Sequence, residues 1–221
     1  MIRNRLAELM QSKGIKVVQL SKETGISRNT ITNTVQNDSE MYRLDTINKI
    51  CNTLKITPCD FFEYSPIEIE IEVSHDPEIL HIGRTVNESY IADDINLELD
   101  IIFTLIKDGR TKNVYGTLKY LPQSVITTSP IHTSSISYSL DMNENQDNIN
   151  ELSSEVNNLS SGFKSMIYKK MINEIKTYLI NYSANIEYPF YTTYLINFDV
   201  EIKDVVQDVQ IEVISNVFTK F

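Results

Sequence analysis

Apolar residues recur at helical spacing along the first 65 residues of the chain. The repeat of three and four residues predicts one helix over residues 2–13 and another over residues 44–54. Their apolar positions are Ile2, Leu6, Leu9 and Met10 in the first, and Leu44, Ile47, Ile50, Cys51 and Leu54 in the second. Pro58 opens a short further helix that includes Asp60, Phe61 and Phe62. We therefore expect this part of the chain to be all-helical.

Between these helices, residues 17–35 predict two short helices joined by a tight turn. Gly25 ends the first of them, because glycine adopts the left-handed backbone conformation at little cost. Ser27 is a good N-cap for the second, and Ile31 and Val35 give that helix one apolar face. Its other face carries Arg28, Asn29, Thr32 and Asn33. Arginine suits guanine, asparagine suits adenine and the threonine methyl suits thymine, so this face is suited to reading bases in a major groove.

Two helices around a glycine also occur in all-helical proteins that never bind DNA. The surrounding sequence favours DNA binding. The stretches ISRNTI at 26–31 and LDTINKICNTLKITPCDFFEY at 44–64 resemble the lambda-repressor/Cro (XRE) family, and its small single-domain bacterial members in particular. This resemblance covers residues 1 to about 65. It implies a five-helix DNA-binding head in which Arg28, Asn29, Thr32 and Asn33 face bases, while Ser27 and the helix ends meet phosphates.

The chain departs from the family pattern at three places. Val17 stands where the family often has a glutamine that braces a phosphate, and Thr34 stands where an apolar residue is usual. The loop of residues 36–43 is acidic, whereas the corresponding loop in the family is often basic.

Pro66 separates two expected domains, because it favours an extended conformation at Ser65. We expect a helix-turn-helix DNA-binding domain at residues 1–66, called the head below. The rest of the chain, residues 67–221 or the body, is expected to be an α+β domain for dimerisation and for binding a signal or a partner. Its fold is expected to combine an antiparallel sheet with a long helical segment.

Alternation of apolar and polar residues predicts the strands of the body. The stretch IEIEIEV at 67–73 alternates between apolar and acidic residues, which indicates a strand with one buried face. Asp108-Gly109 is a strong hairpin signal between a strand at 95–107 and its return at 113–121. Further strands are expected at 134–140, 195–203 and 208–217, the last two as a closing hairpin.

A helical segment with a narrow apolar seam is expected in the second half of the body. The seam consists of Ile149, Leu152, Val156, Leu159, Phe163 and Met166. Residues 160–162 interrupt it, since a glycine inside a helix costs about 1 kcal/mol. A stronger helix is expected over residues 163–182, with Ile167, Met171, Ile175, Tyr178 and Leu179 facing inward. The seam is open to two interpretations, a dimer or partner contact and packing on the chain's own sheet.

Charge is distributed unevenly between the two expected domains. The net charge of −10 over 221 residues has the wrong sign for binding a polyanion. The head, however, has nine Lys and Arg residues against seven Asp and Glu residues, whereas the body has 11 against 23. The head therefore carries +2 and the body −12, which fits a DNA-binding head joined to an acidic body that stays off DNA.

Further features limit the location and the redox state of the chain. It contains no run of about 18 apolar residues and no signal-peptide pattern, so we expect a soluble, cytoplasmic protein with no membrane partner. Cys51 and Cys59 lack a metal-binding spacing and are expected to be buried free thiols.

We find no convincing enzyme site in the sequence. Many lambdoid repressors carry a C-terminal protease domain that uses a serine and a lysine to cut its own linker, and Ser165 with Lys203 vaguely resembles that pair. Ser165 falls in a helical pattern, however, and the chain contains no Ala-Gly or Cys-Gly bond of the kind that is cut. His75, His81 and His132 lack metal-ligand spacing, and no phosphate-binding loop occurs. We expect a non-enzyme without cofactor or metal.

Two classes of function remain. The first is a homodimeric transcriptional repressor of a prophage or other mobile element, which binds an operator with inverted half-sites. Repression would be relieved by a protein inducer, or antirepressor, that binds the C-terminal domain, and not by self-cleavage. The second class is a metabolite-responsive regulator, or an antitoxin that autoregulates its operon. The absent cleavage site, the acidic body and the Cro-like head favour the first class.

Overall fold

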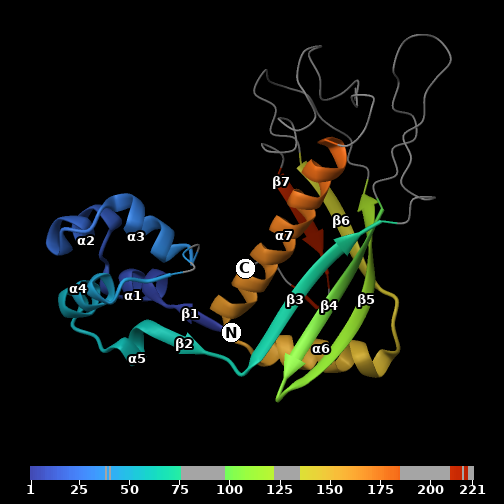
Figure 1. Ribbon diagram of the computed structural model, residues 1–221, viewed down its shortest axis with the longest axis horizontal. Coiled ribbons are helices and arrows are strands. Elements are labelled where there is room, and N and C mark those ends of the chain that lie inside the picture. Colours follow the sequence, from blue (N-terminus) through green and yellow to red (C-terminus); the bar gives the residue numbers. More distant parts are fainter. Residues whose placement is uncertain are drawn as a thin grey trace, which may run out of the picture. The chain divides into compact units, whose positions relative to one another are not determined.

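The computed structural model describes residues 1–37, 39, 41–75, 98–121, 135–184, 210–215 and 217–218. The chain divides into two compact units, Met1–Glu68 and Ile69–Phe221. Figure 1 shows the helices of the first unit and the sheet and helices of the second.

The first unit is built from short helices around one apolar core. They are α1 (Leu6–Lys13), α2 (Val17–Thr24), α3 (Arg28–Val35), α4 (Leu44–Leu54) and α5 (Pro58–Phe61). Gly14 and Gly25 end the first two with φ angles of 66° and 72°, which a side chain would oppose. The core consists of Leu6, Met10, Leu20, Ile31, Ile47, Ile50, Cys51, Leu54 and Phe61.

The beginning of the chain does not form the helix that the sequence predicts over residues 2–13. Strand β1 (Ile2–Asn4) instead pairs antiparallel with β2 (Phe62–Tyr64), with Ile2 opposite Tyr64. The helix starts only at Leu6, whose backbone N–H donates to the side-chain oxygen of Asn4 at 2.9 Å. This hydrogen bond resembles that of an N-cap, which ends the extended stretch and starts the helix.

Two side chains that the sequence assigns to the core or to a buried position lie at the surface. Leu44, the first residue of α4, is 83% exposed. Cys59, near the start of α5, is also exposed, so the prediction of two buried thiols is wrong for it. Cys51 is buried, and this burial raises the pKa of its thiol.

The second unit is organised around a five-stranded sheet. Its order is β3 (Ile67–Ser74), β4 (Leu99–Lys107), β5 (Arg110–Leu121), β6 (Ser135–Met142) and β7 (Gln210–Ile214). Asp108 and Gly109 join β4 to β5 with φ angles of 50° and 71°, and Lys107 lies opposite Arg110. Two positive φ angles are what a type I′ turn requires, so the predicted hairpin is confirmed.

The sheet is mixed, so the prediction of an antiparallel sheet is wrong. Strands β4, β5 and β6 pair antiparallel, but β7 lies parallel to β6, with Tyr138 opposite Val213. A parallel pair needs a long crossover, and the two helices between β6 and β7 form it. The first strand of the expected closing hairpin, at 195–203, lies outside the described residues.

Helices α6 (Gln146–Asn158) and α7 (Ser161–Ala184) pack against the sheet (Figure 1). The break between them falls at residues 159–160, next to the predicted interruption. The seam side chains Leu152, Val156, Leu159 and Phe163 are buried. On α7, Lys170 donates to the carbonyl oxygen of Ile69 at 3.3 Å. These four seam residues therefore pack within their own chain, whereas Ile149 and Met166 at the two ends of the seam are half-buried.

Among the helices that the structure describes, none is long and apolar enough to cross a membrane.

Candidate nucleic-acid interface

The turn between α2 and α3 is fixed by hydroxyl groups. Ser21 donates to the carbonyl oxygen of Ile26 at 2.6 Å, and Thr24 donates to that of Leu20 at 2.6 Å. Ser27 is the N-cap of α3, and its hydroxyl accepts from the N–H of Thr30 at 3.1 Å. These bonds satisfy groups that a tight turn would leave unpaired, so the direction in which α3 leaves the turn is determined locally.

One side of α3 is anchored in the head. Ile31 is fully buried, and Thr34 is 2% exposed. Thr34 stands where the family usually has an apolar residue, but its hydroxyl donates to the carbonyl oxygen of Thr30 at 2.8 Å. The polar atom is therefore satisfied within its own helix, and the methyl group can fill the apolar position.

The opposite side of α3 presents the predicted base-reading residues. Arg28, Asn29 and Asn33 are exposed, and Thr32 is half-buried. Within the part of the chain that the structure describes, these four side chains have no hydrogen bond or ion pair. Ser27 lies at the start of the same helix. The arrangement leaves the donors and acceptors of one helix face available to a ligand, while contact with bases stays a prediction.

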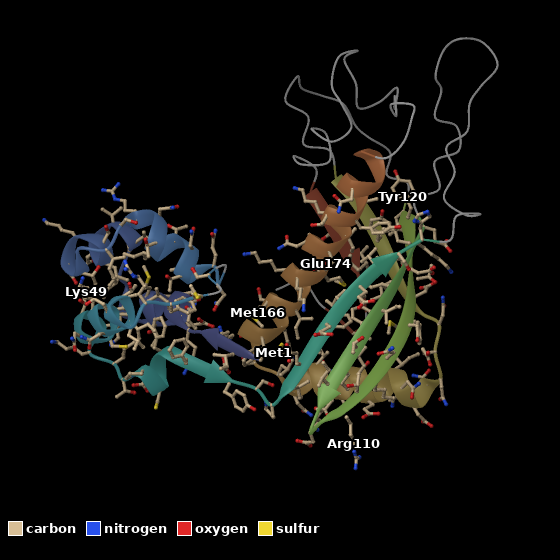
Figure 2. All side chains as sticks on the ribbon, in the orientation of Figure 1. Met1, Lys49, Arg110, Tyr120, Met166 and Glu174 are labelled. Carbon is tan, nitrogen blue, oxygen red and sulfur yellow. The ribbon has the colours of Figure 1, made fainter. Side chains whose placement is uncertain are left out.

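Some charged side chains elsewhere in the head form ion pairs. Lys49, labelled on α4 in Figure 2, lies 2.8 Å from Asp45. The buried Arg3 pairs with Glu8 at 2.6 Å and with Glu63 at 2.5 Å. Lys16, Lys22 and Lys55 are exposed and, like the α3 residues, form no ion pair within the described chain.

The structure also reveals a residue that sequence reasoning missed, at the other end of α3. Asn4 is 1% exposed, and its side-chain nitrogen donates to Thr34 O at 2.6 Å, Asn37 Oδ1 at 2.7 Å and Tyr42 Oη at 2.9 Å. The side chain of Asn37 donates back to Asn4 O at 3.1 Å. An asparagine two positions before Leu6 is a helix N-cap signal, which would have placed the start of the predicted first helix after residue 4.

A second candidate is a polar cleft of about 380 Å³ between the β4–β5 hairpin and α6. Its lining has three cationic and three acidic side chains beside Leu105: Lys107, Arg110, Lys112, Asp108, Glu151 and Glu155. Lys107 pairs with Glu155 at 2.6 Å, which raises the pKa of Lys107, and Lys112 pairs with Glu151. Arg110 projects from the hairpin tip in Figure 2. The three cationic and three acidic side chains balance, so the lining of the cleft has no net charge.

Of the residues considered for other chemistry, Ser165 and His75 are among those that the structure describes. Ser165 is exposed on α7, whereas Lys203, His81 and His132 lie outside the described residues. His75 forms a hydrogen bond with Tyr178 through its Nδ1 atom. In the described ranges, no group of three His, Cys, Asp or Glu side chains could hold a metal ion.

Comparison with known proteins supports the interpretation of the head. Residues 5–66 match the model of the Cro/C1-type HTH DNA-binding domain, and no family model matches the C-terminal region. No curated protein matches the chain. A crystal structure of "a putative DNA-binding protein from Bacteroides fragilis" is 27% identical, with a TM-score of 0.27, and the match covers 28% of this chain and 100% of that chain. The family match identifies residues 5–66 as a Cro/C1-type helix-turn-helix DNA-binding domain, which supports a DNA-binding regulator.

Proposed function

We propose that the protein is a transcriptional repressor that recognises its operator through α3. The observation that carries this proposal is the unpaired face of α3, where Arg28, Asn29, Thr32 and Asn33 have no partner in the described chain. Arginine and asparagine form two-point hydrogen bonds with guanine and adenine, and these bonds specify sequence. The N-terminus of α3, capped by Ser27, suits a phosphate because unpaired N–H groups point outward there.

We further propose that the repressor is a homodimer held by residues 67–221. The head has a charge of only +2 and a reading helix of eight residues, so a single head contacts little DNA. Two heads on one duplex supply the missing affinity, because the second binding event becomes intramolecular. A twofold dimer requires inverted half-sites, and their centres should lie roughly one helical turn, about 10 base pairs, apart.

The proposed repressor belongs to a prophage or other mobile element. An inducing protein that binds the body relieves repression. The buried seam of α6 and α7 is not available to this protein. The exposed row Glu68, Glu70 and Glu72 on β3 is available. Binding would separate or reorient the heads so that they no longer match the half-site spacing, and a few kcal/mol of differential affinity suffices for such a shift.

In vitro selection of random duplexes with the full chain tests DNA recognition. We expect an enriched inverted repeat whose two halves are both protected in a footprint. Enrichment of no sequence would contradict recognition, and protection of a single half-site would contradict the dimer.

Light scattering and half-site titrations test the assembly. We expect a dimer at micromolar concentration, and a duplex with both half-sites should bind about 100-fold tighter than a duplex with one. A monomer with equal affinity for the two duplexes would contradict bivalent binding.

Blotting of the repressor in cells treated with a DNA-damaging agent tests the mode of relief. The full-length chain should persist. Accumulation of a fragment cut between residues 66 and 95 would contradict an inducing protein and favour self-cleavage.

A further inference from the structure

The C-terminal end of α3 is held by residues that are distant in sequence. The side-chain nitrogen of Asn4 donates to Thr34 O at 2.6 Å, and Thr34 is the second-last residue of α3. Thr34 O also accepts from the backbone N–H of Asn37 at 3.1 Å, so Asn4 is the second donor to a carbonyl group in the last turn of α3. Asn4 therefore acts on the helix end opposite to the one that Ser27 caps.

Asn4 and Asn37 form a reciprocal pair, which we call the Asn4–Asn37 clamp. Asn37 Oδ1 accepts from the backbone N–H of Asn4 at 2.8 Å and from its side chain at 2.7 Å. In return, the side-chain nitrogen of Asn37 donates to Asn4 O at 3.1 Å. Asn37 has a φ angle of 56°, and asparagine tolerates this left-handed conformation better than most residues. The clamp thus joins the residue just beyond α3 to strand β1.

Strand β1 connects the clamp to the end of the head. Asn4 lies opposite Phe62 in the β1–β2 pair, and the ladder continues as Ser65 N–H donates to Met1 O at 2.9 Å. From Ser65 the chain enters β3, which begins at Ile67. The buried Arg3 holds the pair from its other side through Glu63. A continuous set of hydrogen bonds therefore runs from the end of α3 to the first residues of β3.

We propose that Asn4 and Asn37 are positioning residues for DNA recognition, which fix the orientation of α3 against the β1–β2 pair. This inference rests on the proposed base reading by α3 and deepens it. Base recognition needs hydrogen-bonding groups placed to within a fraction of an ångström, whereas phosphate attraction tolerates small rotations. Loss of the clamp therefore reduces discrimination between sequences more than it reduces attraction to any duplex.

Two substitutions weaken the clamp to different extents. Asn4→Ala removes the side-chain bonds to Thr34 O and Asn37 Oδ1 but keeps the two clamp bonds to the backbone of Asn4. Asn37→Gly removes all three clamp bonds, while glycine keeps the left-handed backbone accessible. Thr57→Ala is the matched control, because it removes the capping box of α5, where Thr57 accepts from Asp60 N–H at 3.2 Å, and leaves α3 untouched. It destabilises the same head without acting on the clamp.

The first experiment measures discrimination with the full chain. The ratio of affinities for a selected operator and a scrambled duplex should fall about tenfold in Asn4→Ala and in Asn37→Gly, and it should stay within about threefold in Thr57→Ala. The double variant should lose less than the sum of the two single variants, because both single variants remove the bond between the two side chains. Clamp variants that keep the wild-type ratio while wild type discriminates would overturn the proposal alone. If the wild-type protein bound the operator and the scrambled duplex equally well, both this proposal and the proposed function would be overturned.

The second experiment needs no DNA. Amide hydrogen exchange at Val35, Gln36 and Asn37 should accelerate about tenfold in Asn4→Ala, whereas the amides of α4 keep their wild-type rates. Uniform acceleration across the head would indicate general destabilisation and would overturn a specific role in positioning α3.

Discussion

Helices α3 and α6 both bury one apolar face, but they use their polar side chains in opposite ways. On α6, Glu151 and Glu155 pair with lysines of the β4–β5 hairpin. On α3, Arg28, Asn29 and Asn33 are exposed and have no partner in the described chain. Exposure alone therefore does not identify a functional face. The α3 face is available to a ligand, whereas Glu151 and Glu155 of α6 are engaged within the fold.

The largest expected effect comes from the core that supports α3. Leu20 is fully buried in α2, so Leu20→Ala should lower the free energy of unfolding by about 2–5 kcal/mol and abolish operator binding near the melting temperature. Urea unfolding monitored by circular dichroism measures this change. Leu44→Ala is the control, since this 83% exposed leucine should change stability by no more than about 0.5 kcal/mol. Equal losses in the two variants would place Leu44 in the core.

A smaller effect is expected at the N-cap of α3. Ser27→Ala removes the acceptor for Thr30 N–H and should lower the free energy of unfolding by about 0.5–2 kcal/mol. Ser27→Gly should lower it by only a few tenths of a kcal/mol. The two variants can be compared in the same urea titration. If glycine were as costly as alanine, the hydroxyl hydrogen bond would not be what starts α3.

The smallest effect concerns a paired polar group away from α3. Hydrogen bonds from the side chain and the backbone of Thr57 lower the pKa of Asp60. Because the pKa of Asp60 is lower in the folded state, the ionised side chain stabilises the fold at pH values above the pKa in the unfolded state, about 3.9. This contribution is lost as the pH falls through the pKa in the folded state. Asp60→Asn should therefore be less stable than wild type at pH 7 and nearly equal to it at low pH. A difference independent of pH would exclude ionisation of Asp60 as the cause.

Local signals in the sequence predict much of the fold. Gly25 and Ser27 mark the turn because the left-handed conformation and the N-cap hydrogen bond each depend on one residue and its neighbours. Asp108-Gly109 predicts the hairpin for the same reason. The sequence also predicts an interruption at residues 160–162, but the break lies at residues 159–160 and Gly162 is part of α7.

Interactions between distant residues were not predictable in the same way. The alternation of apolar residues in β7 is the same for parallel and antiparallel pairing, so it cannot show that Tyr138 lies opposite Val213. Strand β1 has three residues, too few for alternation to outweigh the helical spacing of Ile2 and Leu6. The seam residues were predicted, but only the structure shows that they pack within their own chain.

In the candidate site, too, the features set by local sequence were predictable and those set by distant residues were not. Helical spacing places Arg28, Asn29, Thr32 and Asn33 on one face, and the structure has them there. The contribution of Asn4 depends on contacts with residues 30 or more positions away, which no local pattern encodes. Its position before Leu6 signals a helix start but gives no sign of a bond to α3.

The most direct test of base reading by α3 compares its unpaired face with the paired face of α6. In gel-shift titrations on the selected operator, Arg28→Ala, Asn29→Ala and Asn33→Ala should each weaken binding by about 1–3 kcal/mol, with unchanged unfolding curves and little effect on a scrambled duplex. Glu151→Gln, which breaks an internal pair, should leave operator affinity unchanged. Unchanged operator affinity in Asn29→Ala and Asn33→Ala, with the fold intact, would contradict the assignment of α3 as the reading helix.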